Sequence, residues 1–174
     1  MSNSEVSAET ILNIQNTLAN YCIALDDQNF QLLRKVFTPD TVANYGAVTG
    51  GNDDIRGVDS IITKVEEVLK NLRTQHALST QRITFREDGS CDVRTYFQAH
   101  TFSDNPETGL RHTTFFGYYD DNLKEVGTQT WRILERKVKV HVSDVSNSLM
   151  GTQLTDCRTK HPRIKNNSTV ATDR

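Results

Sequence analysis

The first half of the chain repeats apolar residues at the spacing of amphipathic helices. Apolar side chains recur at three- and four-residue steps over residues 11–25, which makes one continuous stripe on a helix. A second stripe covers residues 30–37 and ends before Pro39, and a third covers residues 58–72. The pattern therefore predicts three N-terminal helices, with polar residues between the first two that can cap the second helix.

The second half has the composition of strands. Segments 77–86, 91–102, 110–119 and 127–142 are rich in Thr, Val, Ile and aromatic residues, and a short strand is expected at 41–45. Turn-forming residues separate the long segments at 88–89, 106–109 and 121–124. Helices followed by an antiparallel meander indicate an α+β fold, and helices on one face of a curved sheet leave a pocket between the layers.

Composition changes near residue 143. Only eight of the last 32 residues are apolar, and they follow no steady period, so this segment buries too little to offset its ordering entropy. We expect a domain over residues 1–142 and a polar C-terminal tail over residues 143–174.

Charge and hydropathy narrow the functional class. The 174 residues carry 20 basic and 22 acidic side chains, mean hydropathy is −0.56, and no apolar run approaches a membrane span. No basic excess is present to bind nucleic acid or an anionic membrane. The N-terminus lacks the segments of a signal peptide, and the three cysteines form no C-x-x-C pair. We expect a soluble, cytoplasmic protein without nucleic-acid or membrane partners.

Four polar residues near otherwise apolar faces are candidates for acid–base chemistry: Tyr21, Asp26, Tyr45 and His76. A histidine paired with an aspartate can take and return a proton near neutral pH, and tyrosine hydroxyls can orient a carbonyl group. Each residue also has an ordinary structural interpretation, as a helix cap, a core tyrosine or a surface histidine. Composition and spacing alone predict an α+β domain with a pocket and no specific function.

Other motifs indicate no metal or cofactor. His100 and His112 have no carboxylate or further histidine at a recognisable metal-binding spacing, and Gly50-Gly51 lacks the lysine and helix of a phosphate loop. Most aromatic residues of the strands are expected in the core, while a few, such as Phe97, can line an apolar pocket.

Two stretches resemble the SnoaL-like proteins of the NTF2-like superfamily, and most of all its scytalone dehydratase-like branch. They are the run at 24–39, which contains Leu-Arg-Lys-Val before a proline, and Leu-Arg-Thr-Gln-His at 72–76. The resemblance extends over residues 11–142. It implies a cone of three helices packed on a strongly curved, mainly antiparallel sheet around one pocket.

The resemblance also implies roles for the four candidates. An Asp26–His76 pair lies inside the pocket, Tyr45 helps to hold a water against the substrate carbonyl, and Tyr21 is similar to a catalytic tyrosine of bile-acid dehydratases. A second pocket histidine falls near His100.

Several positions depart from the dehydratase pattern. Leu25 replaces a tyrosine, and Thr113 and Phe115 stand where the dehydratase has Ser and Asn, so we expect a more apolar pocket that does not take scytalone. Arg94-Thr-Tyr96 lacks the Arg-x-Asp of the limonene-epoxide-hydrolase type. His100, Thr113, Phe115 and Phe97 are the expected substrate-binding residues.

These inferences lead to a cofactor-free lyase or isomerase, a dehydratase or double-bond isomerase of the SnoaL-like type. Its substrate is a small apolar carbonyl compound such as a polyketide or terpenoid of secondary metabolism, and related members guide cyclisations. The alternative is a non-catalytic ligand-binding or assembly domain. By the same resemblance we expect a homodimer or homotrimer. The tail is either solvated or a partial lid over the pocket, formed by residues 145–154.

Overall fold

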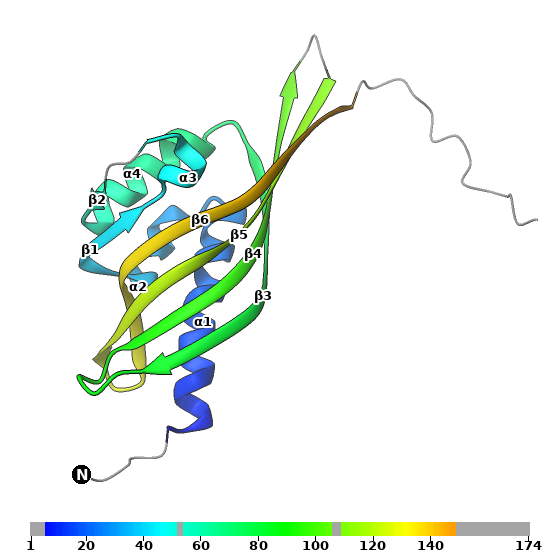
Figure 1. Cartoon of the computed structure of the whole chain (residues 1–174). Helices are drawn as coiled ribbons and strands as arrows, with labels where there is room; N and C mark the ends of the chain where they lie inside the picture. Colours follow the sequence, from blue (N-terminus) through cyan, green and yellow to red (C-terminus); the bar gives the residue numbers. More distant parts are fainter. Residues whose placement is uncertain (1–5, 52–53, 106–108, 149–174) are drawn as a thin grey trace, which may run out of the picture.

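Helices cover one face of a six-stranded sheet (Figure 1). The computed structural model describes residues 6–51, 54–105 and 109–148. The helical elements in these ranges are α1 (Ala8–Asp26), the 3-10 turn Phe30–Leu32, α2 (Leu33–Val36), α3 (Gly46–Thr49) and α4 (Val58–Leu69). The Ser7 hydroxyl caps α1 by accepting a hydrogen bond from the backbone N–H of Thr10 at 3.1 Å.

The sheet has the order β2-β1-β6-β5-β4-β3. Its strands are β1 (Phe37–Asn44), β2 (Ile55–Arg56), β3 (Arg73–Phe85), β4 (Cys91–Asn105), β5 (Gly109–Gly127) and β6 (Thr130–Ser148). Only the β1–β6 pair is parallel, and the other pairs in the described chain are antiparallel. The expected α+β class and mainly antiparallel sheet are confirmed.

The helix α1 extends past its apolar stripe at both ends, but the helices of the second and third stripes are shorter than those stripes. The stripe at 30–37 splits into a 3-10 turn and the single α-turn of α2, and Phe37 already begins β1. The chain enters β1 at Phe37, so the helix ends there. Pro39 therefore lies within a strand and does not follow a helix directly. The expected strand at 41–45 is part of β1, which ends at Asn44, and Tyr45 is the N-cap residue of the short helix α3.

The turn expected at 121–124 is wrong, because β5 continues through it to Gly127. Asp121 pairs with Arg136 of β6, and the Asn122 amide donates to the Asp92 carboxylate at 3.0 Å. These cross-strand partners satisfy polar residues that would otherwise favour a turn. The reversal to β6 falls instead at residues 128–129, where Gln129 has a φ of 54°.

Strand β6 also runs past the expected end of the strand region at residue 142 and continues to Ser148. The first part of the expected lid therefore forms sheet, and Val145 lines the same cavity as His76. Residues 149–174, with the remainder of that lid, lie outside the described residues.

The far ends of β4, β5 and β6 extend beyond the helices (Figure 1), and we call this part of the sheet the arm (residues 101–105, 109–114 and 143–148). The β5–β6 register shifts between Phe116 and Gly117, next to the arm. A Cβ atom at Gly117 would collide with the Lys139 carbonyl, so this close backbone approach requires glycine.

One ion pair is completely buried in the core. Arg136 donates from Nε and one terminal nitrogen to both carboxylate oxygens of Asp121, each at 2.7 Å, and neither side chain has any exposed surface. The Arg136 guanidinium lies over the rings of Tyr21 and Tyr119, at 4.0 and 4.2 Å from their centroids. The pair thus fixes β5 and β6 beneath α1.

No helix within residues 6–51, 54–105 and 109–148 is both long and apolar enough to span a membrane.

The buried pair gives a stability prediction. Replacing Asp121 with alanine leaves the Arg136 charge buried without its partner and should lower the free energy of unfolding by about 3–5 kcal/mol. The double variant Asp121→Leu/Arg136→Met removes both charges, so it should be clearly more stable than the single variant. Urea denaturation measures both, and a double variant no more stable than Asp121→Ala would contradict this account.

Candidate active site

The end of α1 and the start of β3 bring Asp26 and His76 together, although fifty positions separate them in sequence. The Asp26 Oδ1 atom lies 2.6 Å from His76 Nδ1. The Asp26 carboxylate also accepts hydrogen bonds from the Thr74 hydroxyl at 2.9 Å and from the His76 backbone N–H at 2.8 Å. The sequence-based pairing of the two residues is therefore present in the structure.

These contacts determine the charge state of Asp26. Burial by itself would raise the pKa of this carboxyl, but the hydrogen bonds from His76 and the nearby His76 charge outweigh it, and the pKa is lowered. An ionised carboxylate only accepts hydrogen bonds, so His76 Nδ1 carries the proton that joins the pair. His76 Nε2 is then the basic nitrogen of the ring.

His76 forms part of the wall of a cavity of about 440 Å³. Its side chain is 8% exposed, whereas Asp26 lies behind it and does not line the cavity. Hydrophobic side chains from both layers make most of the remaining wall: Leu25, Val48, Ile55, Val65, Val68, Leu69, Leu72, Phe97, Ala99, Phe115 and Val138. A base in such surroundings acts with little competition from water.

Tyr21 and Tyr45 line the same cavity. Tyr21 makes an edge contact with the His76 ring, with centroids 6.5 Å apart. The Tyr45 hydroxyl is buried and forms no hydrogen bond of normal geometry with any described residue. Burial raises the pKa of both phenols, so both keep their protons at neutral pH and can donate a hydrogen bond to a ligand.

The charged group behind these tyrosines was not among the residues predicted from the sequence. The positive charge of Arg136 opposes the rise in the pKa of Tyr45, and the buried Nη1 atom of Arg136 forms no hydrogen bond of normal geometry with any described residue. Both tyrosines thus have a fixed cation beside them. The alternation of strand residues could have identified Asp121, the partner of Arg136, because Tyr119, Asp121 and Leu123 share one strand face. The turn expected at 121–124 concealed this pattern.

The structure places three of the four expected substrate-binding residues on the cavity wall: Phe97, Thr113 and Phe115. His100 is the exception. Its strand neighbours Ala99 and Thr101 line the cavity, so His100 points to the opposite face of the sheet. There its Nδ1 lies 3.0 Å from both His112 Nε2 and the Thr114 hydroxyl.

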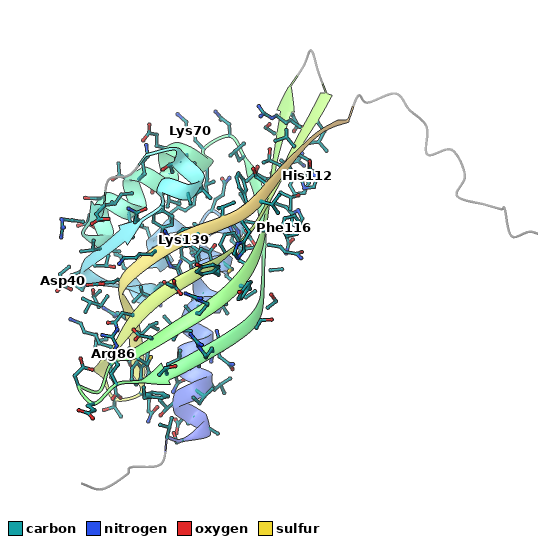
Figure 2. All side chains as sticks on the ribbon, in the orientation of Figure 1. Asp40, Lys70, Arg86, His112, Phe116 and Lys139 are labelled. Carbon is teal, nitrogen blue, oxygen red and sulfur yellow. The ribbon has the colours of Figure 1, made fainter. Side chains whose placement is uncertain are left out.

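Figure 2 shows His112 and Phe116 on the side of the sheet away from the helices. The expectation that His100 binds substrate is therefore wrong. A one-residue change in strand register reverses the face on which a side chain lies, and the resemblance aligned this histidine only with such a slip. Among the described residues, no group of three or more His, Cys, Asp or Glu side chains could hold a metal ion.

The lowered pKa of Asp26 gives a pH-dependent stability prediction. A carboxyl whose pKa is lower in the folded state than its unfolded value of about 3.9 stabilises the fold at pH values above about 3.9. This contribution to the free energy of unfolding is lost as the pH falls through the folded pKa. Asp26→Asn should therefore be less stable than the parent chain at pH 7, and the difference should shrink by pH 3. Urea unfolding at both pH values measures it, and a constant difference would contradict the role of the charge.

Comparisons with known proteins agree with this fold. The SnoaL-like domain model matches residues 6–137, while no curated protein matches the chain. The Kfla4162 protein of Kribbella flavida superposes with a TM-score of 0.70 at 19% identity, covering 79% of this chain and 95% of that one. A candidate scytalone dehydratase from Novosphingobium aromaticivorans gives 0.65 at 21% identity, with 79% and 91% covered.

A type 2 hexachlorocyclohexane dehydrochlorinase, LinA, gives a TM-score of 0.68 at 11% identity, covering 84% of this chain and 95% of that one. At such identities the structural likenesses establish the fold alone. The family match spans most of the chain and both members of the Asp26–His76 pair. The chain therefore belongs to the SnoaL-like domain family.

Proposed function

We propose that this protein is a cofactor-free lyase or isomerase that removes a proton beside the carbonyl group of a small, largely apolar metabolite. The observation that carries the proposal is the Asp26–His76 pair, which presents a basic ring nitrogen to an apolar cavity. The names of two structural neighbours, a candidate scytalone dehydratase and a dehydrochlorinase, describe eliminations and favour the same class.

The first step is proton abstraction. His76 Nε2 takes the proton from the carbon next to the carbonyl, and the electron pair of that C–H bond moves into an enolate. Asp26 stabilises the imidazolium through the 2.6 Å contact with Nδ1. Because the Asp26 carboxylate is held by three hydrogen bonds, the ring keeps its orientation throughout.

The enolate oxygen needs a hydrogen-bond donor, and the buried Tyr45 hydroxyl forms no hydrogen bond of normal geometry with any described residue. Tyr21 is the second candidate donor, since its ring contacts His76 and lines the same cavity. The Arg136 charge beside both phenols favours negative charge at this position.

The second step decides the reaction type. If the substrate has a β-hydroxyl group, the enolate expels it while the imidazolium returns its proton, and the products are one water and a conjugated double bond. If it has a β,γ double bond instead, the imidazolium protonates the γ carbon and the double bond moves. The same residues serve both reactions. A polyketide or terpenoid with a reactive carbonyl fits the apolar walls of the cavity.

Deuterium exchange tests the proton abstraction without the natural substrate. In D2O, the protein should accelerate exchange of the α-protons of 2-tetralone, an apolar bicyclic ketone, as followed by proton NMR. His76→Ala should lower this acceleration by about 10²–10⁴-fold because the general base is lost. Tyr45→Phe should lower it by about 10²-fold through loss of the enolate donor.

A matched control is His141→Asn, because His141 is exposed and stacks on Tyr96 away from the cavity. This variant should exchange protons at the parent rate. Binding of 2-tetralone without any acceleration over His76→Ala would contradict the enzyme proposal and favour a ligand-binding domain. With biosynthetic intermediates, loss of one water by mass spectrometry identifies a lyase, and a product of equal mass identifies an isomerase.

We also propose that the protein forms a homodimer or homotrimer through the sheet face opposite the helices. Large hydrophobic side chains are exposed on that face, among them Tyr96, Phe116 and Val142. Ion pairs such as Arg94–Asp120 lie on the same face, so it offers charges of both signs to a second copy.

Light scattering tests this assembly. The chain has a mass of 19.7 kDa, and a dimer or trimer should give two or three times that value at micromolar concentration. Phe116→Ser combined with Val142→Ser should shift the mass toward the monomer because it removes apolar surface from the face. A parent protein at the monomer mass would contradict the proposal.

A further inference from the structure

The cavity wall carries cationic side chains and no carboxylate. Its ionisable residues are His76, Lys64, Arg111 and the three neutral tyrosines Tyr21, Tyr45 and Tyr119, and none of the lining residues is an aspartate or glutamate. The whole chain carries a net charge of −2, so the positive wall does not reflect a basic protein. A cavity of this kind attracts a ligand with a negatively charged group.

The two cations are not equivalent. The Lys64 ammonium lies 3.0 Å from the Glu67 carboxylate, which offsets much of its charge. The Arg111 guanidinium has no ion pair or hydrogen bond with any residue in the described part of the chain. A planar guanidinium binds the two oxygens of a carboxylate through parallel hydrogen bonds, so Arg111 is the stronger anion-binding group.

Two threonine hydroxyls follow Arg111 along the cavity face of the arm. Thr113 precedes Phe115 and follows Arg111 on the cavity face of β5, and Thr101 is its partner on β4. Ser143 of β6 also lines the wall, but it pairs with Phe115 and so lies four residues along the strands from Arg111. Among the described residues the hydroxyls of Thr113 and Thr101 form no side-chain hydrogen bonds with one another or with Arg111, so they can donate to a ligand.

Strand register places this polar group at a fixed distance from the base. His76 pairs with Ala99, and Ala99 pairs with Phe115, so these three residues form one row across the sheet. Arg111 lies four residues from Phe115 along β5, which corresponds to about 13 Å of strand. Apolar side chains, including Val65, Val68 and Leu69 of α4, form the wall of the same cavity.

We propose that the substrate carries a carboxylate at the end opposite its reactive carbonyl, and that Arg111 with Thr113 and Thr101 binds this carboxylate. The assignment rests on the proposed function, because it takes His76 as the reactive end of the cavity. The substrate is thus an elongated keto acid with an apolar middle. Arg111 determines specificity and takes no part in the proton transfer.

Binding of matched ligands tests the assignment independently of turnover. Isothermal titration calorimetry compares 6-phenylhexanoate with its uncharged amide, 6-phenylhexanamide, at pH 7.5. The parent protein should bind the carboxylate at least tenfold more tightly than the amide. Arg111→Gln should weaken carboxylate binding about tenfold and leave amide binding unchanged, which also shows that the variant is folded. Lys64→Gln should cause a smaller loss because Glu67 already offsets that charge.

Arg56→Gln is the matched control, since Arg56 of β2 is exposed and does not line the cavity. It should bind both ligands like the parent protein. Equal affinities of the parent for the acid and the amide would overturn the assignment, as would an equal loss of both ligands in Arg111→Gln. Tighter binding of 6-phenylhexyl phosphate than of the carboxylate would overturn the choice of anion. None of these results depends on the deuterium exchange, so the two proposals fail separately.

Discussion

The hydrogen bonds that the Asp26 carboxylate accepts from β3 connect the helical layer to the sheet at the point where the chemistry is proposed. Asp26 is the last residue of α1, and it holds both the backbone and the ring of His76. Thr74 adds a third hydrogen bond from the same strand face. The position of the base, its tautomer and the wall of the cavity all depend on this one contact between α1 and β3.

A second charged contact lies deeper and has a different effect. The Asp121–Arg136 pair is shielded from water, so its charges act on the nearby tyrosine rings with little screening. A buried guanidinium beside two phenols stabilises negative charge at the inner end of the cavity. The site thus combines a base held by one aspartate with a cation held by another, and hydrophobic walls lie between this end and Arg111.

The sequence predicted the parts of this arrangement that follow from local pattern. Residues 11–25 form the middle of α1 because their apolar stripe packs on the sheet, and the content of Thr, Val, Ile and aromatic residues identified four long strands. The Asp26–His76 pair came from resemblance, since no local rule relates residues fifty positions apart. The family and the fold were predicted in the same way, and both are confirmed.

The features that could not be predicted from the sequence depend on contacts between distant segments. Asp121 looked like a turn residue because its partner Arg136 is recognisable only once β5 and β6 are paired. His100 was assigned to the wrong face because face depends on register, which a single-residue slip reverses. Arg111 became a candidate for anion binding only once the structure placed two cations and no carboxylate on the cavity wall.

The central claim is that Asp26 fixes the His76 ring with Nδ1 protonated and Nε2 free to act as the base. Nitrogen-15 NMR of the histidine rings at pH 7 measures this tautomer directly, with His76→Ala identifying the signals. The account predicts a protonated Nδ1 and an unprotonated Nε2 for His76, with loss of this preference in Asp26→Asn. A His76 ring protonated at Nε2 and bare at Nδ1 would contradict it.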